Sequence, residues 1–144
     1  MDIVKSYHPK TVLDVGCGLG HMVKEMIRQG IDAHGIDFSI DLIPFWKDEE
    51  HFSVRDATNL KGFADSSYDL VISSDFFEHV PEENIDAVAN EMRRVSKEAI
   101  FTVVADDRGA ILSPRQKLYH CTHKSLDWWN KRLTGIDVFS SHDL

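Results

Sequence analysis

The sequence predicts a single α/β domain in which helices cover both faces of a mostly parallel β-sheet. Short apolar runs rich in β-branched residues alternate with longer amphipathic stretches, as in sheets whose parallel strands are joined by crossover helices. A glycine cluster directly follows the first run and precedes a helical stretch. The 144 residues suffice for one hydrophobic core. We therefore expect one three-layer αβα domain over residues 1–144, with a Rossmann-like sheet of about six strands.

Six short runs are predicted to form the strands. The first ends at the glycine cluster, and the second ends at Asp37. The fourth does not alternate between apolar and polar residues, so it is expected to be buried on both faces. The predicted strands span residues 11–15, 33–37, 52–54, 68–73, 99–104 and 136–140.

Four stretches between these runs are predicted to be helical. The first has apolar residues at helical spacing and ends at Gly30. Ser39 is a suitable N-cap for the second, with Pro44 near its start. The third carries its apolar residues on one face, and Ser125 caps the fourth. Three of these helices are expected over residues 22–29, 82–96 and 125–133, and the second begins after Ser39.

The composition is that of an ordinary globular protein, with 42% hydrophobic and 28% charged residues. No apolar run approaches the roughly 20 residues needed to cross a bilayer, and the first residues lack the apolar stretch of a signal peptide. Cys17 and Cys121 are too few for a disulfide framework. We therefore expect a reduced, cytoplasmic protein without a membrane segment.

Charge is distributed unevenly along the chain. The formal net charge is −8, which disfavours a general nucleic-acid binder. Residues 1–92 carry 7 basic and 18 acidic residues, whereas residues 93–132 carry 9 basic and 4 acidic residues. Two interpretations are open: the basic segment is a solvated face, or it faces a pocket that receives an anionic acceptor.

The sharpest motif is the run Asp14-Val15-Gly16-Cys17-Gly18-Leu19-Gly20, between the first strand and the first helix. Glycines at such a turn let the backbone approach a ligand where a Cβ atom would clash. The spacing is G-x-G-x-G rather than the G-x-G-x-x-G of dinucleotide-binding turns. Asp14 precedes the first glycine, and its carboxylate suits a cationic ammonium group better than a pyrophosphate.

With this motif the sequence resembles the class I S-adenosylmethionine-dependent methyltransferases of the small-molecule type. The resemblance extends from Thr11 to about Phe139. The resemblance implies that the glycine turn holds the methionine part of the cofactor. It also implies that Asp37 accepts hydrogen bonds from both ribose hydroxyls, as a carboxylate with two oxygens can, and that Phe38 packs on the adenine. For Asp37, capping of the following helix is the alternative.

Two further segments match the cofactor-binding pattern of this family. Asp56 and Ala57, after the third strand, match the pair that contacts the adenine, although Asp56 could also be a turn residue. Ser73 ends the fourth strand, which in the family passes beside the sulfonium. The expected cofactor-binding residues are Asp14, Gly16, Cys17, Gly18, Gly20, Asp37, Phe38, Asp56, Ala57 and Ser73.

The reacting groups are expected after the fourth strand, where open α/β sheets bind ligands. The stretch Glu78-His79-Val80-Pro81 is similar to a pattern common in small-molecule methyltransferases. Histidine titrates near neutrality, so His79 is the candidate general base; alternatively it only holds the loop. Asp75, Glu78 and His79 could also group around a divalent metal, but no metal is assigned.

The acceptor pocket is expected to be covered by the segment after the fifth strand. A zinc site at His120, Cys121 and His123 lacks a fourth ligand. In the family this stretch passes over the acceptor pocket, so the resemblance implies that His120, Thr122 and His123 contact the acceptor. Trp128 and Trp129 are interpreted as core residues rather than as a pocket wall. The candidate acceptor-binding residues are Asp75, Arg108, Arg115, Tyr119, His120 and His123.

Two expectations depart from the family pattern. Only ten residues precede the first strand, so we expect no N-terminal lid. Five residues follow Phe139, too few for the seventh strand, so the sixth should pair with the fifth or with a partner chain. An acceptor site without a lid would need a large acceptor, a homodimer partner or loop closure to exclude water.

Taken together, the resemblance implies an S-adenosylmethionine-dependent methyltransferase acting on an oxygen or nitrogen of a small acceptor, which is anionic or sugar-like if the basic segment lines the pocket. Two alternatives stay open. One is a cofactor-binding accessory module without catalysis, and the other is a nucleic-acid methyltransferase, which the charge and the loop sequence disfavour.

Overall fold

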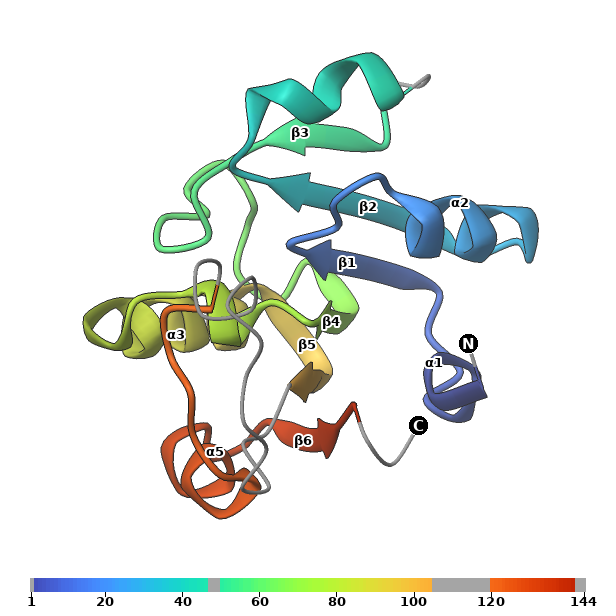
Figure 1. The fold of residues 1–144 in the computed structure, drawn as a ribbon. Coiled ribbons are helices and arrows are strands. Elements are labelled where there is room, and N and C mark those ends of the chain that lie inside the picture. Colours follow the sequence, from blue (N-terminus) through green and yellow to red (C-terminus); the bar gives the residue numbers. More distant parts are fainter. Residues whose placement is uncertain (1, 47–49, 105–119, 142–144) are drawn as a thin grey trace.

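The predicted sheet is present, and all its strands are parallel. The computed structural model describes residues 2–46, 50–104 and 120–141, and within them six strands run in the order β3-β2-β1-β4-β5-β6 (Figure 1). The last strand pairs directly with β5, as expected. The strands are β1 (Thr11–Val15), β2 (Asp32–Asp37), β3 (Phe52–Val54), β4 (Tyr68–Ser74), β5 (Ser96–Val104) and β6 (Asp137–Ser140).

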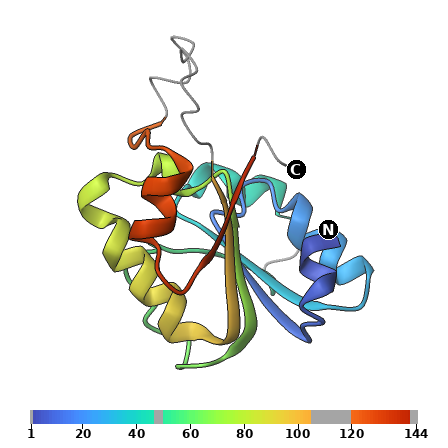
Figure 2. The same cartoon turned by 90° about the horizontal axis from the view of Figure 1, so that it is seen from below.

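Helices cover both faces of the sheet, which gives the three layers that Figure 2 shows edge-on. One face carries α3 (Ile85–Val95) and α5 (Leu126–Arg132), and the other carries α1 (Asp2–Ser6) and α2 (His21–Arg28). Three 3₁₀ helices complete the described elements: η1 (Ile40–Phe45), η2 (Phe77–His79) and η3 (Glu82–Asn84). No helix in the described ranges is long and apolar enough to pass through a membrane.

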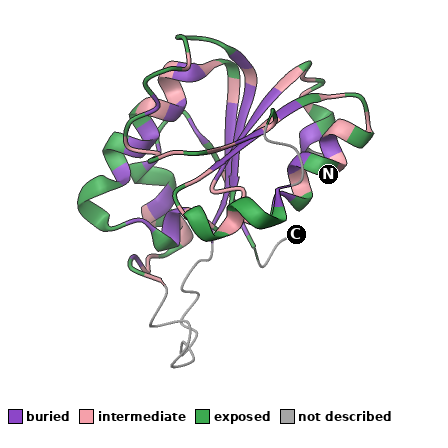
Figure 3. Cartoon of the chain, turned by 90° about the horizontal axis from the view of Figure 1, so that it is seen from above, coloured by how far each residue is buried: buried purple, intermediate pink, exposed green. Residues whose placement is uncertain are grey.

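The sheet separates two hydrophobic clusters, and the buried residues lie mostly on the strands and on the inner faces of the helices (Figure 3). On one side, Leu13 and Val71 pack against Val88 and Met92 of α3 and against Trp129 of α5. The fully buried Trp129 confirms its assignment to the core. On the opposite side, α1 and α2 supply Val4, Val23 and Met26.

Two helix predictions agree with the structure, the one over 82–96 holds for α3 but begins with the 3₁₀ helix η3 and ends where β5 starts, and one needs correction. Gln29 caps the end of α2 and is followed by Gly30 at φ 84°, and the Ser125 hydroxyl accepts a hydrogen bond from the Trp128 amide. The stretch after Ser39 forms a 3₁₀ helix rather than an α-helix, and Pro44 lies in its last turn, not near its start. Proline has no amide proton to donate, so it ends this short element instead of opening it.

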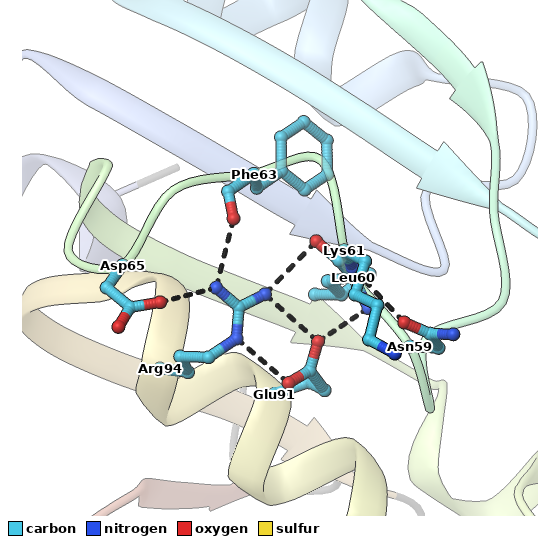
Figure 4. A network of polar contacts seen from close by, with 7 residues as sticks. All are labelled: Asn59, Leu60, Lys61, Phe63, Asp65, Glu91 and Arg94. Carbon is cyan, nitrogen blue, oxygen red and sulfur yellow. Dashed lines mark hydrogen bonds and ion pairs between the residues drawn. The ribbon is translucent and has the colours of Figure 1, made fainter.

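Residues 55–67, which connect β3 to β4, contain no helix, and Arg94 of α3 holds this connection in place (Figure 4). Its guanidinium donates to the carbonyls of Leu60 and Phe63 at 3.1 and 3.0 Å, and it pairs with Asp65 at 2.7 Å. Glu91 accepts from the same guanidinium and from the Leu60 amide. One planar group therefore organises several backbone groups, which lysine could not do.

Replacing Arg94 with alanine is expected to lower the free energy of unfolding, because the Leu60 and Phe63 carbonyls lose charged donors. Arg94→Lys should recover part of the loss, since it retains the charge without the planar fork. Lys131→Ala, which breaks an exposed ion pair with Asp127, is the control and should cost about 0.5 kcal/mol or less. Urea unfolding measures all three, and equal stability of the Arg94→Ala and Lys131→Ala variants would refute the assignment.

Candidate active site

A cavity of about 660 Å³ opens at the carboxyl ends of the strands. Its size is typical of small-molecule sites, and its position is where open parallel sheets bind ligands. One wall comes from the glycine turn and from the ends of β2 and β3, and the other from the segment after β4 and from α3. The lining residues are Gly16, Ile36, Asp37, Phe38, Val54, Arg55, Asp56, Ala57, Thr58, Asp75, Phe76, His79, Val80, Pro81, Asn84 and Val88.

The glycine turn after β1 is fixed by the neighbouring strand. The amides of Gly16 and Cys17 both donate to the Ile36 carbonyl, at 2.8 and 2.9 Å. Gly16 has φ 77°, and a Cβ atom there would lie 2.3 Å from the Phe76 ring. Only glycine fits this position, because both the backbone conformation and the space exclude a side chain. The Phe76 ring therefore packs directly on the Gly16 backbone at the cavity.

Asp37 stands at the end of β2 with its carboxylate anchored at both oxygens. The amide of Gly18 donates to Oδ2 and that of Ser39 to Oδ1, each at 3.1 Å. Each carboxylate oxygen has a second lone pair, so the group can still accept two hydroxyl donors. Ser39 occupies the N-cap position of η1 without a side-chain cap bond. Asp37 thus joins the turn to η1, and its carboxylate could accept hydrogen bonds from a vicinal diol.

The far end of the same wall suits an aromatic ring system. Phe38 lines the cavity with 79% of its surface exposed, which is unusual for a phenylalanine. Asp56 also lines the cavity, and its Oδ1 accepts from the amide and the hydroxyl of Thr58. These bonds hold the pKa of Asp56 below its ordinary value. Ala57 completes this end, so an apolar face and an ionised carboxylate lie side by side.

Five of the ten predicted cofactor residues do not line the cavity: Asp14, Cys17, Gly18, Gly20 and Ser73. Asp14 is buried in β1, the Ser73 hydroxyl is hydrogen bonded to Thr102 at 2.6 Å inside the sheet, and the Cys17 thiol lies against Gly35. Burial and the charges of Asp14 and Asp37 raise the pKa of Cys17. Their role toward a ligand remains a prediction. Gly18 and Gly20 complete the turn, also with positive φ.

Asp14 gives the protein a distinct pH dependence. Burial, and secondarily the charge of Asp37, raises the pKa of Asp14 to about 7. A carboxyl whose pKa rises on folding stabilises the folded state at low pH and loses this contribution as the pH rises to about 7. Between pH 5 and pH 8 we expect a loss of about 2–3 kcal/mol in the free energy of unfolding from this residue.

Chemical denaturation of the wild type and of Asp14→Asn at both pH values measures this effect. The pH-dependent loss should be smaller in the variant by about the same 2–3 kcal/mol, because asparagine does not titrate. Equal pH dependence in the two proteins would contradict the buried, proton-binding Asp14.

The opposite wall of the cavity is formed by the loop that follows β4. Asp75 sits at its start with φ 47°, in the left-handed region, and its amide donates to the Val103 carbonyl. His79 lies in η2, exposed, with its side chain at the cavity. Glu78 points inward and is 1% exposed. The loop therefore presents His79 and Asp75 to the same cavity as the glycine turn.

Three histidines from two distant segments gather beside this wall. The rings of His79 and His120 meet edge to face with centroids 4.8 Å apart, and His123 stacks on His120 at 5.3 Å. Burial, with smaller contributions from His79 and His123, lowers the pKa of His120. Ligand atoms of Glu78, His79 and His120 lie within 4.8 Å of one another, so this group could hold a metal ion. His120 and His123 are thus near the cavity without lining it.

The predicted acceptor contacts Arg108, Arg115 and Tyr119 lie outside the described residues. The described part of the basic segment is largely engaged in local ion pairs, which favours the solvated-face interpretation of the charge asymmetry. Lys124 pairs with Glu82 at 2.8 Å and lies over the Trp128 ring. Similar pairs join Lys97 to Asp69, Lys131 to Asp127, and Arg132 to Asp86.

Several cavity residues were not singled out from the sequence. Phe76 has a recognisable signal, because it follows the predicted fourth strand directly and fills the space that Gly16 leaves. Asn84 and Val88 reach the cavity only because η3 and α3 pack against this side of the sheet. Glu78 has a structural role that its sequence position does not reveal, since its carbonyl accepts the amides of Cys121 and Thr122.

Comparison with known proteins agrees with this geometry. The methyltransferase domain family model matches residues 12–99. Over 119 residues the chain is 30% identical to norajmaline N-methyltransferase of Rauvolfia serpentina, covering 76% of this chain and 40% of that protein. Over 122 residues it is 33% identical to demethylmenaquinone methyltransferase of Renibacterium salmoninarum, covering 83% and 50%.

The fold agrees as well. A solved S-adenosylmethionine-dependent methyltransferase from Archaeoglobus fulgidus matches with a TM-score of 0.73 at 24% identity, covering 86% of this chain and 58% of that one. The present chain corresponds to half or less of the length of the two curated relatives. It belongs to the methyltransferase domain family and has a Rossmann-like fold.

Proposed function

We propose that this domain transfers a methyl group from S-adenosylmethionine to a nitrogen or oxygen of a small-molecule acceptor. The observation that carries the proposal is the continuity of one cavity from Asp37 and Phe38 at the end of β2 to Asp75 and His79 after β4. A cofactor held at the first pair and an acceptor held at the second would share one cavity.

The residues present fit the cofactor. Asp37 retains free lone pairs for the two ribose hydroxyls, and the exposed ring of Phe38 offers an apolar face to the adenine. Asp56, with its second carboxylate oxygen, would accept from the adenine amino group. Gly16 also lines the cavity, so its backbone would lie beside the methionine part. When bound, S-adenosylmethionine supplies an electrophilic methyl group on its sulfonium.

His79 is proposed as the general base. An acceptor nitrogen or oxygen that must lose a proton as it attacks needs a proton acceptor within hydrogen-bond reach. His79 lines the cavity with its side chain exposed, in edge-to-face contact with the ring of His120. This contact would hold the His79 imidazole in position toward the acceptor. The exclusion of water and the alignment of the two reactants provide the rest of the acceleration.

The class of acceptor is proposed from two observations. The two relatives are named for methylating an alkaloid nitrogen and a quinone precursor, both small molecules. The described basic residues between 93 and 132 are largely paired with neighbouring carboxylates, which weakens the case for a nucleic-acid or strongly anionic acceptor. A small molecule is therefore the favoured class of acceptor.

The test uses the protein with methyl-labelled S-adenosylmethionine and a panel of small amines, phenols and quinols, with an RNA sample as a separate arm. We expect label in a small-molecule product, and His79→Ala should reduce turnover by about 10²–10⁴-fold while cofactor binding is unchanged. His8→Asn is the matched control, because His8 is exposed at the other end of β1 and asparagine tolerates its left-handed backbone.

Three results would count against parts of the proposal. Cofactor binding without methyl transfer to the small molecules or to RNA would favour a non-catalytic cofactor-binding module. Label in RNA alone would favour a nucleic-acid methyltransferase. Unchanged turnover in His79→Ala would mean that no base is needed at this position.

A further inference from the structure

A second group of metal-ligating side chains lies at the amino ends of β2 and β3, whereas the cavity lies at the carboxyl ends of the strands. Asp32 and His34 are two residues apart on β2, so they face the same side of the sheet. Gly35 is opposite Phe52 in the β2–β3 register, which places His51 beside His34. Ligand atoms of all three residues lie within 4.8 Å of one another. None of them lines the cavity described above.

The two imidazoles have nitrogen atoms that suit a metal ion. His51 Nδ1 lies 3.1 Å from the Ala33 carbonyl, which can only accept, so the proton sits on Nδ1 and Nε2 carries a lone pair. A backbone carbonyl bonded to the second ring nitrogen is the usual support of a metal-binding histidine. His34 Nδ1 is buried and has no hydrogen-bond partner among the described residues. A buried polar atom without a partner is costly, which points to a ligand at this position.

The distance between Asp32 and His34 also fits a bound ion better than a direct bond. Asp32 Oδ1 lies 3.8 Å from His34 Nδ1, beyond hydrogen-bond range. Two ligand atoms of one tetrahedral zinc ion, each about 2.0–2.2 Å from the metal, are about 3.3–3.6 Å apart, slightly less than this distance. The Asp32 and His34 side chains are 59% and 31% exposed, so small rotations could complete the geometry.

We propose that Asp32, His34 and His51 bind a divalent transition-metal ion, with Zn²⁺ as the best match. Two imidazoles and one carboxylate suit Zn²⁺, whereas Mg²⁺ and Ca²⁺ prefer oxygen ligands alone. Water would fill the remaining position. The ion would connect the start of β2 to the start of β3, which is only three residues long at the edge of the described sheet. The site would therefore stabilise this edge rather than take part in methyl transfer.

The test titrates metal-free protein with Co²⁺, whose visible absorption reports imidazole ligation, and then displaces it with Zn²⁺. His34→Gln, His51→Gln and the more conservative Asp32→Asn each remove one ligand. We expect each variant to bind Zn²⁺ at this site at least about 100-fold more weakly than the wild type. His120→Gln is the control, because it disables the separate group of Glu78, His79 and His120.

The outcomes separate the two groups. A bound ion that is lost in the Asp32, His34 and His51 variants and kept in His120→Gln supports the proposal, as does a fall from two bound ions to one. Binding unaffected by His34→Gln and His51→Gln, or lost only in His120→Gln, overturns it. Zn²⁺ should also raise the melting temperature of the wild type more than that of Asp32→Asn.

Discussion

Asp37→Ala is expected to weaken S-adenosylmethionine binding by at least about 100-fold, which corresponds to about 2.8 kcal/mol. The carboxylate would accept two ribose hydroxyls, and hydrogen bonds to a charged group are the strong ones. The substitution also removes the acceptors of the Gly18 and Ser39 amides, which loosens the turn and η1 together. Calorimetry with the cofactor and with its demethylated product measures the loss.

Two further variants separate the hydrogen bonds from the general disturbance. Asp37→Asn retains one acceptor oxygen and should lose less affinity than Asp37→Ala. Asp41→Ala, an exposed acidic residue in η1 that does not line the cavity, should bind the cofactor as the wild type does. Near-normal binding by a folded Asp37→Ala protein would show that the ribose lies elsewhere.

Gly16→Ala is expected to abolish cofactor binding and to destabilise the fold by about 2–4 kcal/mol. A Cβ atom would lie 2.3 Å from the Phe76 ring, and the residue would be held at φ 77°. Overpacking and left-handed backbone each cost about 1–2 kcal/mol or more. Because Gly16 and Phe76 both line the cavity, relief of the clash would also distort the binding surface.

Gly30→Ala is a matched control for this prediction. Gly30 has φ 84°, but a Cβ atom there would meet nothing within 4 Å. It should therefore show only the backbone cost, about 1 kcal/mol. The double variant Gly16→Ala/Phe76→Ala removes the clashing ring. Its loss in free energy of unfolding should be smaller than the sum of the losses of the two single variants. Equal destabilisation by Gly16→Ala and Gly30→Ala in urea unfolding would show that the ring contact is unimportant.

Most of the fold could be predicted because its signals are local. The strand runs, the helical spacing in α2 and α3 and the Ser125 cap are all visible in short windows of sequence. α1 was not predicted, since five residues are too few to show a period, and it depends on the burial of Val4 in the second cluster. The bonds of Arg94 to residues 60–65 are also tertiary, so no local pattern indicates them.

The cofactor side of the cavity was easier to predict than the acceptor side. Asp37 and Phe38 follow directly from the end of a strand, where the topology places ligand contacts. The approach of His120 to His79 depends instead on how two loops pack, across 41 positions of sequence. Asp14 and Ser73 belong to the right strands, but their side chains point into the protein, which only the packing of the sheet determines.

Hydrogen bonds join the loop after β4 to the segment before α5. The Glu78 carbonyl accepts the amides of Cys121 and Thr122, and the Thr122 hydroxyl donates to the Val80 carbonyl at 2.8 Å. A movement of the loop after β4 must therefore carry the start of the segment before α5 with it. A substitution that shifts the backbone of one segment would also shift the other. We therefore expect the two segments to change together when acceptor preference evolves.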